Sequence, residues 1–211
     1  MAKTKLIIFD YDGVLIDTFT VTCQIYNKLF SDLDKKEFSE EEFKDFFDID
    51  WFKSLAKIGL KTEENIQKCK ELYSYYMHKH NSQVKPCTEI PELLHELKKQ
   101  GYKIAIVSNN INENIIPKLE NENLHEFFDL IVDAKDGLKP NPDGINVVLS
   151  KLGIKPDEAI LIGDMDGDIE AAKNANLKKA IGVTWGFHTK ERLINADIII
   201  DSALDLLKVI D

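Results

Sequence analysis

Short runs of apolar residues recur along the chain, and each run ends abruptly at polar residues. The first run, Leu6-Ile7-Ile8-Phe9, stops at Asp10. Runs that are apolar at every position are typical of strands buried on both faces of a sheet. On this pattern we expect strands at 5–9, 103–107, 130–132, 159–162 and 179–183, with a sixth at 197–200.

Between these runs, apolar residues recur at helical spacing, as Leu93, Leu94 and Leu97 do. Strands that alternate with helices are typical of a parallel sheet with right-handed crossovers. We therefore predict an α/β fold, a Rossmann-like parallel sheet with helices on both faces. The carboxyl ends of all strands in such a sheet lie along one edge, where ligands bind.

The segment 17–85 has helical patterns only. Apolar residues recur at helical spacing from Phe19 to Phe30, and Ser39-Glu40-Glu41-Glu42 has the form of a capping box that begins another helix. The segment holds 12 of the 19 aromatic residues, enough to bury a small core of its own. We expect a small all-helical domain at 17–85, and an α/β domain formed by 1–16 and 86–211.

The composition narrows the range of partners. The formal net charge is −10 and the sequence pI is about 5.0, which argues against nucleic acid or an anionic membrane as the main partner. Three cysteines imply no disulfide framework and fit a reducing compartment. The segment before Asp10 is too short for a signal peptide, and no apolar run reaches membrane-spanning length. We expect a cytoplasmic protein.

Acidic residues follow three of the predicted strands at the ligand-binding edge. Asp10 and Asp12 follow the first strand, Asp133 the third and Asp164 the fourth. Carboxylates brought together in this way repel one another unless a cation lies among them. The ligands on offer are oxygens, with no His or Cys in these loops, which favours Mg²⁺ over zinc.

The same edge should hold groups that suit a phosphate. Ser108 and Asn109 follow the second strand, and Lys139 lies in a proline-stiffened loop. A cation, a lysine and several donors around a carboxylate suit a phosphate dianion as substrate. Asp10 could attack phosphorus to form an acyl phosphate. Asp12 could protonate the leaving oxygen and later activate water, while Mg²⁺ and Lys139 spread the charge of the transferred group.

Four segments resemble the motifs of the haloacid dehalogenase superfamily, in the same order and each after a strand. They are DYDGVLIDT, the Ser108-Asn109 step, LKPNPDG and LIGDMDGDIEAAKNAN. The resemblance is greatest to the phosphatase branch with a helical cap inserted after the first motif. The tail GVTWGF, followed by ADIIIDSALDLL, is similar to phosphoglycolate phosphatases and their pyrophosphatase relatives. The resemblance covers nearly all of 1–16 and 86–211, and over the cap it is only architectural.

The resemblance implies a catalytic role for three residues. Asp10 matches the nucleophile, and Asp12 matches the general acid/base, whose main-chain carbonyl would also bind Mg²⁺. Lys139 matches the lysine that steadies the nucleophile and the phosphate. The phosphate contacts that we expect on this basis come from Ser108, Asn109, Gly13 and Lys139.

The resemblance also implies a set of metal-binding residues. Asp164 matches a direct metal ligand, and Asp168 the acid that supports the metal through water or Lys139. The expected Mg²⁺ site therefore comprises Asp10, Asp12, Asp164 and Asp168. Three positions depart from the pattern: Val14 replaces a usual Thr, Asn176 replaces a usual Gly, and Asp166 is an extra acid with no assigned role.

These observations predict a Mg²⁺-dependent phosphoric monoester hydrolase that acts on a small phosphorylated metabolite, as a monomer or weak homodimer. A phosphosugar mutase similar to β-phosphoglucomutase and an inorganic pyrophosphatase are alternatives on the same scaffold. A dehalogenase is disfavoured, because displacement of a halide from carbon needs neither Asp12 nor Mg²⁺. A non-catalytic phosphate-binding module ranks lowest. The substrate stays open, because the cap should select it.

Overall fold

The computed structural model describes residues 2–80 and 83–210, apart from the side chains of residues 51, 77 and 78. The chain divides into two compact units, Met1–Ile16 with Pro86–Asp211, and Asp17–Lys85. We call them the core unit and the helical unit. The chain crosses between them through two short strands that pair with each other, β2 (Ile16–Asp17) and β3 (Lys85–Pro86).

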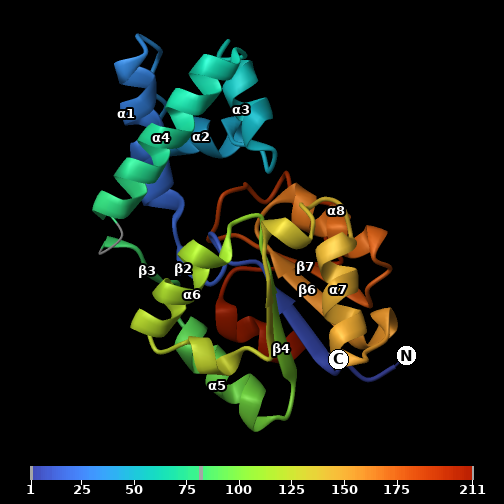
Figure 1. Cartoon of the computed structure of the whole chain (residues 1–211). Coiled ribbons are helices and arrows are strands. Elements are labelled where there is room, and N and C mark those ends of the chain that lie inside the picture. The colour runs from blue at the N-terminus through green and yellow to red at the C-terminus, as the bar shows by residue number, and fades with distance from the viewer. Residues whose placement is uncertain (1, 81–82, 211) are drawn as a thin grey trace. The chain divides into compact units, whose positions relative to one another are not determined.

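The core unit is built on a parallel sheet of six strands, which confirms the predicted fold class and the sixth strand (Figure 1). Across the sheet the order is β5-β4-β1-β6-β7-β8. The strands are β1 (Leu6–Phe9), β4 (Lys103–Val107), β5 (Leu130–Val132), β6 (Ala159–Gly163), β7 (Lys179–Val183) and β8 (Ile198–Ile200).

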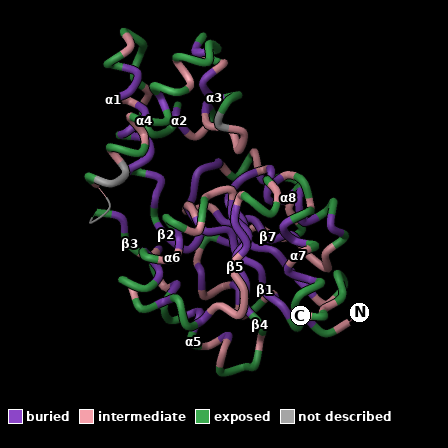
Figure 2. The backbone as a smooth tube through the Cα atoms, in the orientation of Figure 1, coloured by how far each residue is buried: buried purple, intermediate pink, exposed green. Residues whose placement is uncertain are grey.

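Helices cover the sheet. They are α5 (Ile90–Lys99), α6 (Asn112–Asn121), α7 (Asp143–Leu152), α8 (Asp166–Asn174) and α9 (Leu206–Val209), joined in places by the 3-10 turns η2 (His125–Phe127), η3 (Ala134–Asp136), η4 (Pro156–Glu158) and η5 (Ala203–Asp205). Side chains of α7 and α8 share one buried cluster with alternate residues of β1, β4 and β6. Separately, α5 packs against β4, and η5 packs against α5. In Figure 2 the strands are mostly buried, whereas exposed residues are spread along the helices.

The order of the strands places a ligand site at the end of β1. From β1 the chain runs outward through β4 and β5, and then returns to β6 on the other side of β1. Such a reversal opens a crevice at the carboxyl ends of the strands. Phe9 pairs with both Ile106 and Ile162, so the residues that follow these three strands leave the sheet at nearly the same level.

The helical unit contains α1 (Phe19–Asp32), α2 (Glu40–Phe46), α3 (Trp51–Lys57) and α4 (Glu63–His80). Its core is aromatic: the Tyr26 ring lies 5.3 Å from Phe43 and 6.1 Å from Tyr73, between centroids. The predicted capping box is confirmed at α2, where Ser39 and Glu42 each accept from the other's N–H. Within the described part of the chain, no helix combines the length and apolarity that crossing a bilayer requires.

Candidate active site

Asp10 lies directly after β1, near the middle of the sheet. Its N–H donates to the carbonyl of Ile162 over 2.9 Å, which extends the β1–β6 ladder by one residue. Asp10 is buried, with 6% of the residue exposed. Oδ1 accepts from the N–H of Tyr11 (2.6 Å) and pairs with Lys139 Nζ (2.6 Å). Both contacts are to Oδ1, which leaves Oδ2 for a substrate or an ion.

Lys139 is buried and bridges two acids. Its Nζ lies 2.6 Å from Asp10 Oδ1 and 2.6 Å from Asp168 Oδ1. Asn109 holds the backbone of the lysine from both sides: Asn109 Oδ1 accepts from the N–H of Lys139 (2.7 Å), and Asn109 Nδ2 donates to its carbonyl (3.1 Å). The side chain of Asn109, predicted to contact phosphate, is therefore engaged in fixing the lysine loop.

Three buried carboxylates converge beside this lysine. Ligand oxygens of Asp10, Asp164 and Asp168 lie within 4.8 Å of one another. Asp164 Oδ2 accepts from the N–H of Phe187 over 2.5 Å. Asp164 Oδ1 is buried and has no hydrogen-bond partner among the described residues. Both oxygens of Asp168 are engaged: Oδ1 pairs with Lys139 Nζ (2.6 Å), and Oδ2 accepts from the N–H of Met165 (2.9 Å). Asp10 and Asp164 thus offer the oxygens that are best placed for a cation.

The electrostatics of this cluster favour a cation. Burial raises the pKa of Asp10 to about 7; Asp168 adds to the rise, and Lys139 opposes it. Burial also raises the pKa of Asp164 well above its ordinary value, as do Asp168 and Asp10. Burial by itself would lower the pKa of Lys139, but the two acids outweigh it and raise that pKa. An all-oxygen donor set with one orphaned buried oxygen fits Mg²⁺.

Asp12 is oriented by a residue that the sequence analysis left without a role. Asn110 Nδ2 donates to Asp12 Oδ2 over 3.0 Å. The N–H of Asn110 donates to Ser108 Oγ over 3.0 Å, and Ser108 is buried. The Ser108 hydroxyl oxygen acts as the acceptor in this bond, so the bond does not use the hydroxyl proton. The signal for Asn110 was its place in the polar stop that follows β4.

Gly13 makes the close approach of two loops possible. Its φ is +78°, and a Cβ at this position would lie 2.4 Å from Asp164 Oδ2. Its N–H donates to the carbonyl of Ile16 over 2.8 Å. That donor is engaged within its own loop, and the phosphate contact expected at Gly13 stays a prediction. The absence of a side chain at Gly13 admits Asp164 to the cluster.

Asp133 does not join the acids of the site, contrary to expectation. It is buried after β5, where its Oδ1 accepts from the N–H of Lys135 (3.0 Å) and its Oδ2 from the N–H of Asn112 (2.9 Å). Both oxygens thus satisfy backbone donors at the starts of η3 and α6. Asn176, which replaces the usual glycine, has φ +53°, in the left-handed region that Asn tolerates.

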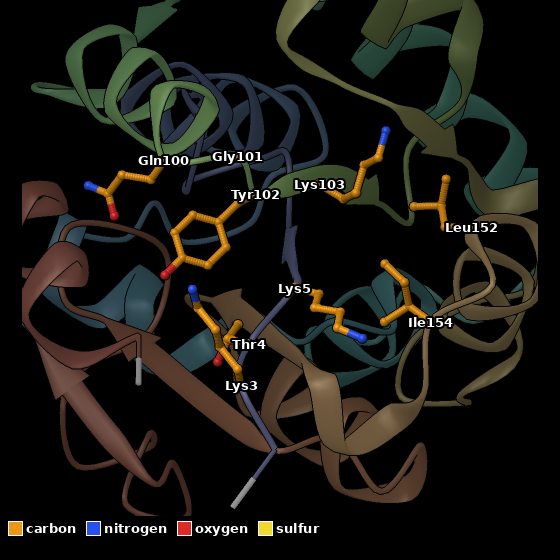
Figure 3. Close-up of a pocket in the computed structure, with 9 residues that line it drawn as sticks. All are labelled: Lys3, Thr4, Lys5, Gln100, Gly101, Tyr102, Lys103, Leu152 and Ile154. Atoms are coloured by element: carbon orange, nitrogen blue, oxygen red, sulfur yellow. The ribbon is translucent and has the colours of Figure 1, made fainter.

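A separate cavity of about 370 Å³ lies at the opposite edge of the sheet. The residues that line it come from the segments that lead into β1 and β4 and from the end of α7. Figure 3 shows them: Lys3, Thr4, Lys5, Gln100, Gly101, Tyr102, Lys103, Leu152 and Ile154. Lys5 pairs with Glu158 and Lys103 with Asp129, at 2.6 and 2.7 Å. With two lysines neutralised and no carboxylate in the lining, this cavity lacks the groups of the Asp10 cluster.

Comparison with known proteins agrees with this geometry. The chain is 32% identical to the pyrophosphatase PpaX of Bacillus velezensis, over 98% of this chain and 96% of that protein. It is 32% identical to a phosphoglycolate phosphatase of Aquifex aeolicus, over 98% and 97%. A haloacid dehalogenase-like family hydrolase from Streptococcus pneumoniae superposes with a TM-score of 0.87 at 25% identity, over 100% of both chains. Residues 7–182 match the family of haloacid dehalogenase-like hydrolases, and the chain belongs to that family.

Proposed function

We propose that this protein is a Mg²⁺-dependent phosphatase that hydrolyses a small phosphorylated metabolite through an aspartyl phosphate on Asp10. One observation carries the proposal: Lys139 and a backbone N–H both contact Asp10 Oδ1, and the Asp10 carboxylate belongs to a buried group of three carboxylates. Membership of the hydrolase family supports the reaction class.

The first half of the reaction transfers the phosphoryl group to the protein. Asp10 Oδ2 attacks phosphorus, and the bond from phosphorus to the leaving oxygen breaks. That oxygen takes a proton from Asp12, which Asn110 orients. Lys139 keeps its charge, because its pKa is raised, and so offsets the negative charge on the transferred group.

The second half releases phosphate. Asp12, now ionised, takes a proton from water as the water oxygen attacks phosphorus. The bond from phosphorus to Asp10 breaks, which restores the Asp10 carboxylate and the protonated Asp12. The groups that would hold Mg²⁺ are the carboxylates of Asp10 and Asp164 and the main-chain carbonyl of Asp12, and Asp168 would act through Lys139. Bound there, Mg²⁺ supplies positive charge that keeps the buried carboxylates ionised and offsets charge on the phosphoryl oxygens.

Pyrophosphate is a second candidate substrate, because a pyrophosphatase from Bacillus velezensis is among the relatives with 32% identity. The two candidates differ in their leaving groups. Phosphoglycolate would release an alkoxide, which needs a proton from Asp12. Pyrophosphate would release phosphate, which is a much better leaving group and depends less on a proton donor.

The test is a panel of phosphoglycolate, pyrophosphate, glucose 1-phosphate and a nucleoside monophosphate, each with Mg²⁺ and with chelator. Asp10→Asn should abolish turnover, and Asp136→Asn, which changes an exposed acid of η3, should not. Asp12→Asn should slow an alkyl phosphate more than pyrophosphate.

Three outcomes would redirect the proposal. Turnover in Asp10→Asn equal to that of the wild type would rule out an aspartyl phosphate intermediate on Asp10. Isomerisation of a sugar phosphate faster than its hydrolysis would indicate a mutase. Binding of phosphate and Mg²⁺ without turnover on the whole panel would indicate a non-catalytic module.

A further inference from the structure

Asp166, the extra acid of the fourth motif, is paired with Arg192. Arg192 Nη2 lies 2.7 Å from Asp166 Oδ2. Arg192 is the only arginine in a sequence with 27 lysine and arginine residues. Arginine presents a planar fork that suits a carboxylate better than the ammonium of lysine does. The pair joins the first residue of α8 to the loop that follows β7, 184–192.

The same loop holds Asp164 through its backbone. The N–H of Phe187 donates to Asp164 Oδ2 (2.5 Å), and the N–H of His188 donates to the Asp164 carbonyl (3.2 Å). His188 is fully buried, and its Nδ1 accepts from the N–H of Asp166 over 3.1 Å. The side chain and the carbonyl of Asp164 thus both depend on where this loop lies.

The loop that follows β7 packs very closely against the Asp164 carboxylate. A Cβ at Gly186 would lie 2.1 Å from Asp164 Oδ2, so the loop passes almost in contact with the carboxylate. One oxygen of that carboxylate is bound to the loop. The other, Oδ1, is buried without a partner among the residues that the structure describes, as expected of an atom reserved for a ligand. A shift of the loop would therefore rotate Oδ1 away from the cluster.

We propose that Asp166 and Arg192 are positioning residues, which clamp the 184–192 loop to the start of α8 and so aim Asp164 Oδ1 at the metal. This inference rests on the proposed function, since it assigns Asp164 to a Mg²⁺ site. The side chains of Arg192 and Asp166 are 23% and 45% exposed. Ion pairs this exposed add little to stability, so the role of the pair should be visible in metal affinity rather than in melting temperature.

The test measures Mg²⁺ binding to the whole, substrate-free protein by calorimetry, so that its result does not depend on turnover. Arg192→Ala and Asp166→Asn should each raise the dissociation constant about tenfold, as loss of an outer partner of a metal ligand does. Arg192→Lys should recover part of the affinity. Because the two residues act as one unit, the double variant should bind no more weakly than either single variant.

Two variants calibrate the measurement. Lys135→Ala breaks a more exposed pair of the core unit, Lys135–Glu113 at 2.6 Å, and should leave Mg²⁺ affinity and melting temperature unchanged. Asp164→Asn should abolish specific binding. Asp166→Asn is nearly isosteric, and it answers the question by itself if Arg192→Ala does not fold.

The inference is overturned if both single variants bind Mg²⁺ within a factor of about two of the wild type, or if their effects add. It is also overturned if the wild type and Asp164→Asn bind Mg²⁺ equally or not at all. If the wild type binds Mg²⁺ and the clamp variants bind it weakly, but no substrate of the panel is hydrolysed, the proposed function fails and the positioning role stands.

Discussion

The side chain of Asn110 donates a hydrogen bond of 3.0 Å to Asp12, from the loop after β4 to the loop after β1. The two residues are 98 positions apart in the sequence. The bond fixes the direction of the carboxylate that we assign as general acid and base. It does so from the loop that also carries Ser108, so the proposed phosphate contact and the proposed proton carrier are held by the same loop.

Replacement of Asn110 by Ala should lower kcat about 10- to 100-fold on an alkyl phosphate and change KM little, since the bond orients a proton donor rather than the substrate. Steady-state kinetics on Asn110→Ala check this. Asn146→Ala, an exposed asparagine of α7, is the control and should behave as the wild type. A large rise in KM at constant kcat would assign Asn110 to substrate binding instead.

Removal of Lys139 should destabilise the fold as well as stop the reaction. In Lys139→Met the carboxylates of Asp10 and Asp168 stay buried without their cation, a loss of about 3–5 kcal/mol when one partner of a buried pair is removed. Urea unfolding with chelator present measures this. The double variant Asp10→Asn/Lys139→Met should regain part of the stability, and a single variant as stable as the wild type would contradict the ion pairs.

Asp164 should destabilise the metal-free protein at neutral pH. Its folded-state pKa lies well above the ordinary 3.8, mainly because it is buried, so the folded state retains a proton that the unfolded state releases. The free energy of unfolding therefore falls as the pH rises from about 4 through the raised pKa. Below about pH 4 the carboxyl is protonated in both states, and this loss of stability is absent. With chelator, Asp164→Asn should melt higher than the wild type at pH 7.5, and the gap should close near pH 4.

Addition of Mg²⁺ should reverse this order at pH 7.5. A ligand that binds only the folded state stabilises it, so the wild type should gain melting temperature and Asp164→Asn should not. Scanning calorimetry at both pH values, with and without Mg²⁺, gives all four comparisons. Equal melting temperatures of the two proteins under every condition would mean that the buried Asp164 carboxylate does not destabilise the fold and that Asp164 does not bind Mg²⁺.

A methyl group at Gly186 should displace Asp164. The Cβ of Gly186→Ala would fall 2.1 Å from Asp164 Oδ2, closer than atoms can pack, so the loop or the carboxylate must move. We expect weaker Mg²⁺ binding and a fall in kcat of at least about tenfold. Gly182→Ala, four residues earlier, meets its nearest atoms at 3.3 Å and should cost much less. Similar metal titrations for the two variants would refute the close approach.

Much of the fold was predictable from periodicity. Apolar runs such as Ile104 to Val107 have the length and the polar stops of buried parallel strands, and the sheet edge follows from their direction. The approximate positions of Asp10, Ser108 and Asp164 therefore followed from the sequence, because each comes directly after a strand.

The fate of individual polar groups was not predictable in this way. Asp133 also follows a strand, yet it caps two backbone turns. The side chain of Asn109 fixes the Lys139 loop, a role that the sequence did not indicate, and the contact between Asn109 and phosphate stays a prediction. A short side chain after a strand can turn toward the crevice or toward its own backbone, and hydrogen bonds with distant loops decide between them.

By itself, the sequence determined which residue types reach the catalytic edge, since local periodicity places strand ends. Only the tertiary structure decided which oxygens stay open: Lys139 occupies Asp10 Oδ1, Phe187 occupies Asp164 Oδ2, and Asp164 Oδ1 is left. It also paired Asp166 with Arg192, 26 residues away. Contacts of this kind depend on how loops from separate strands pack, and no local pattern encodes that packing.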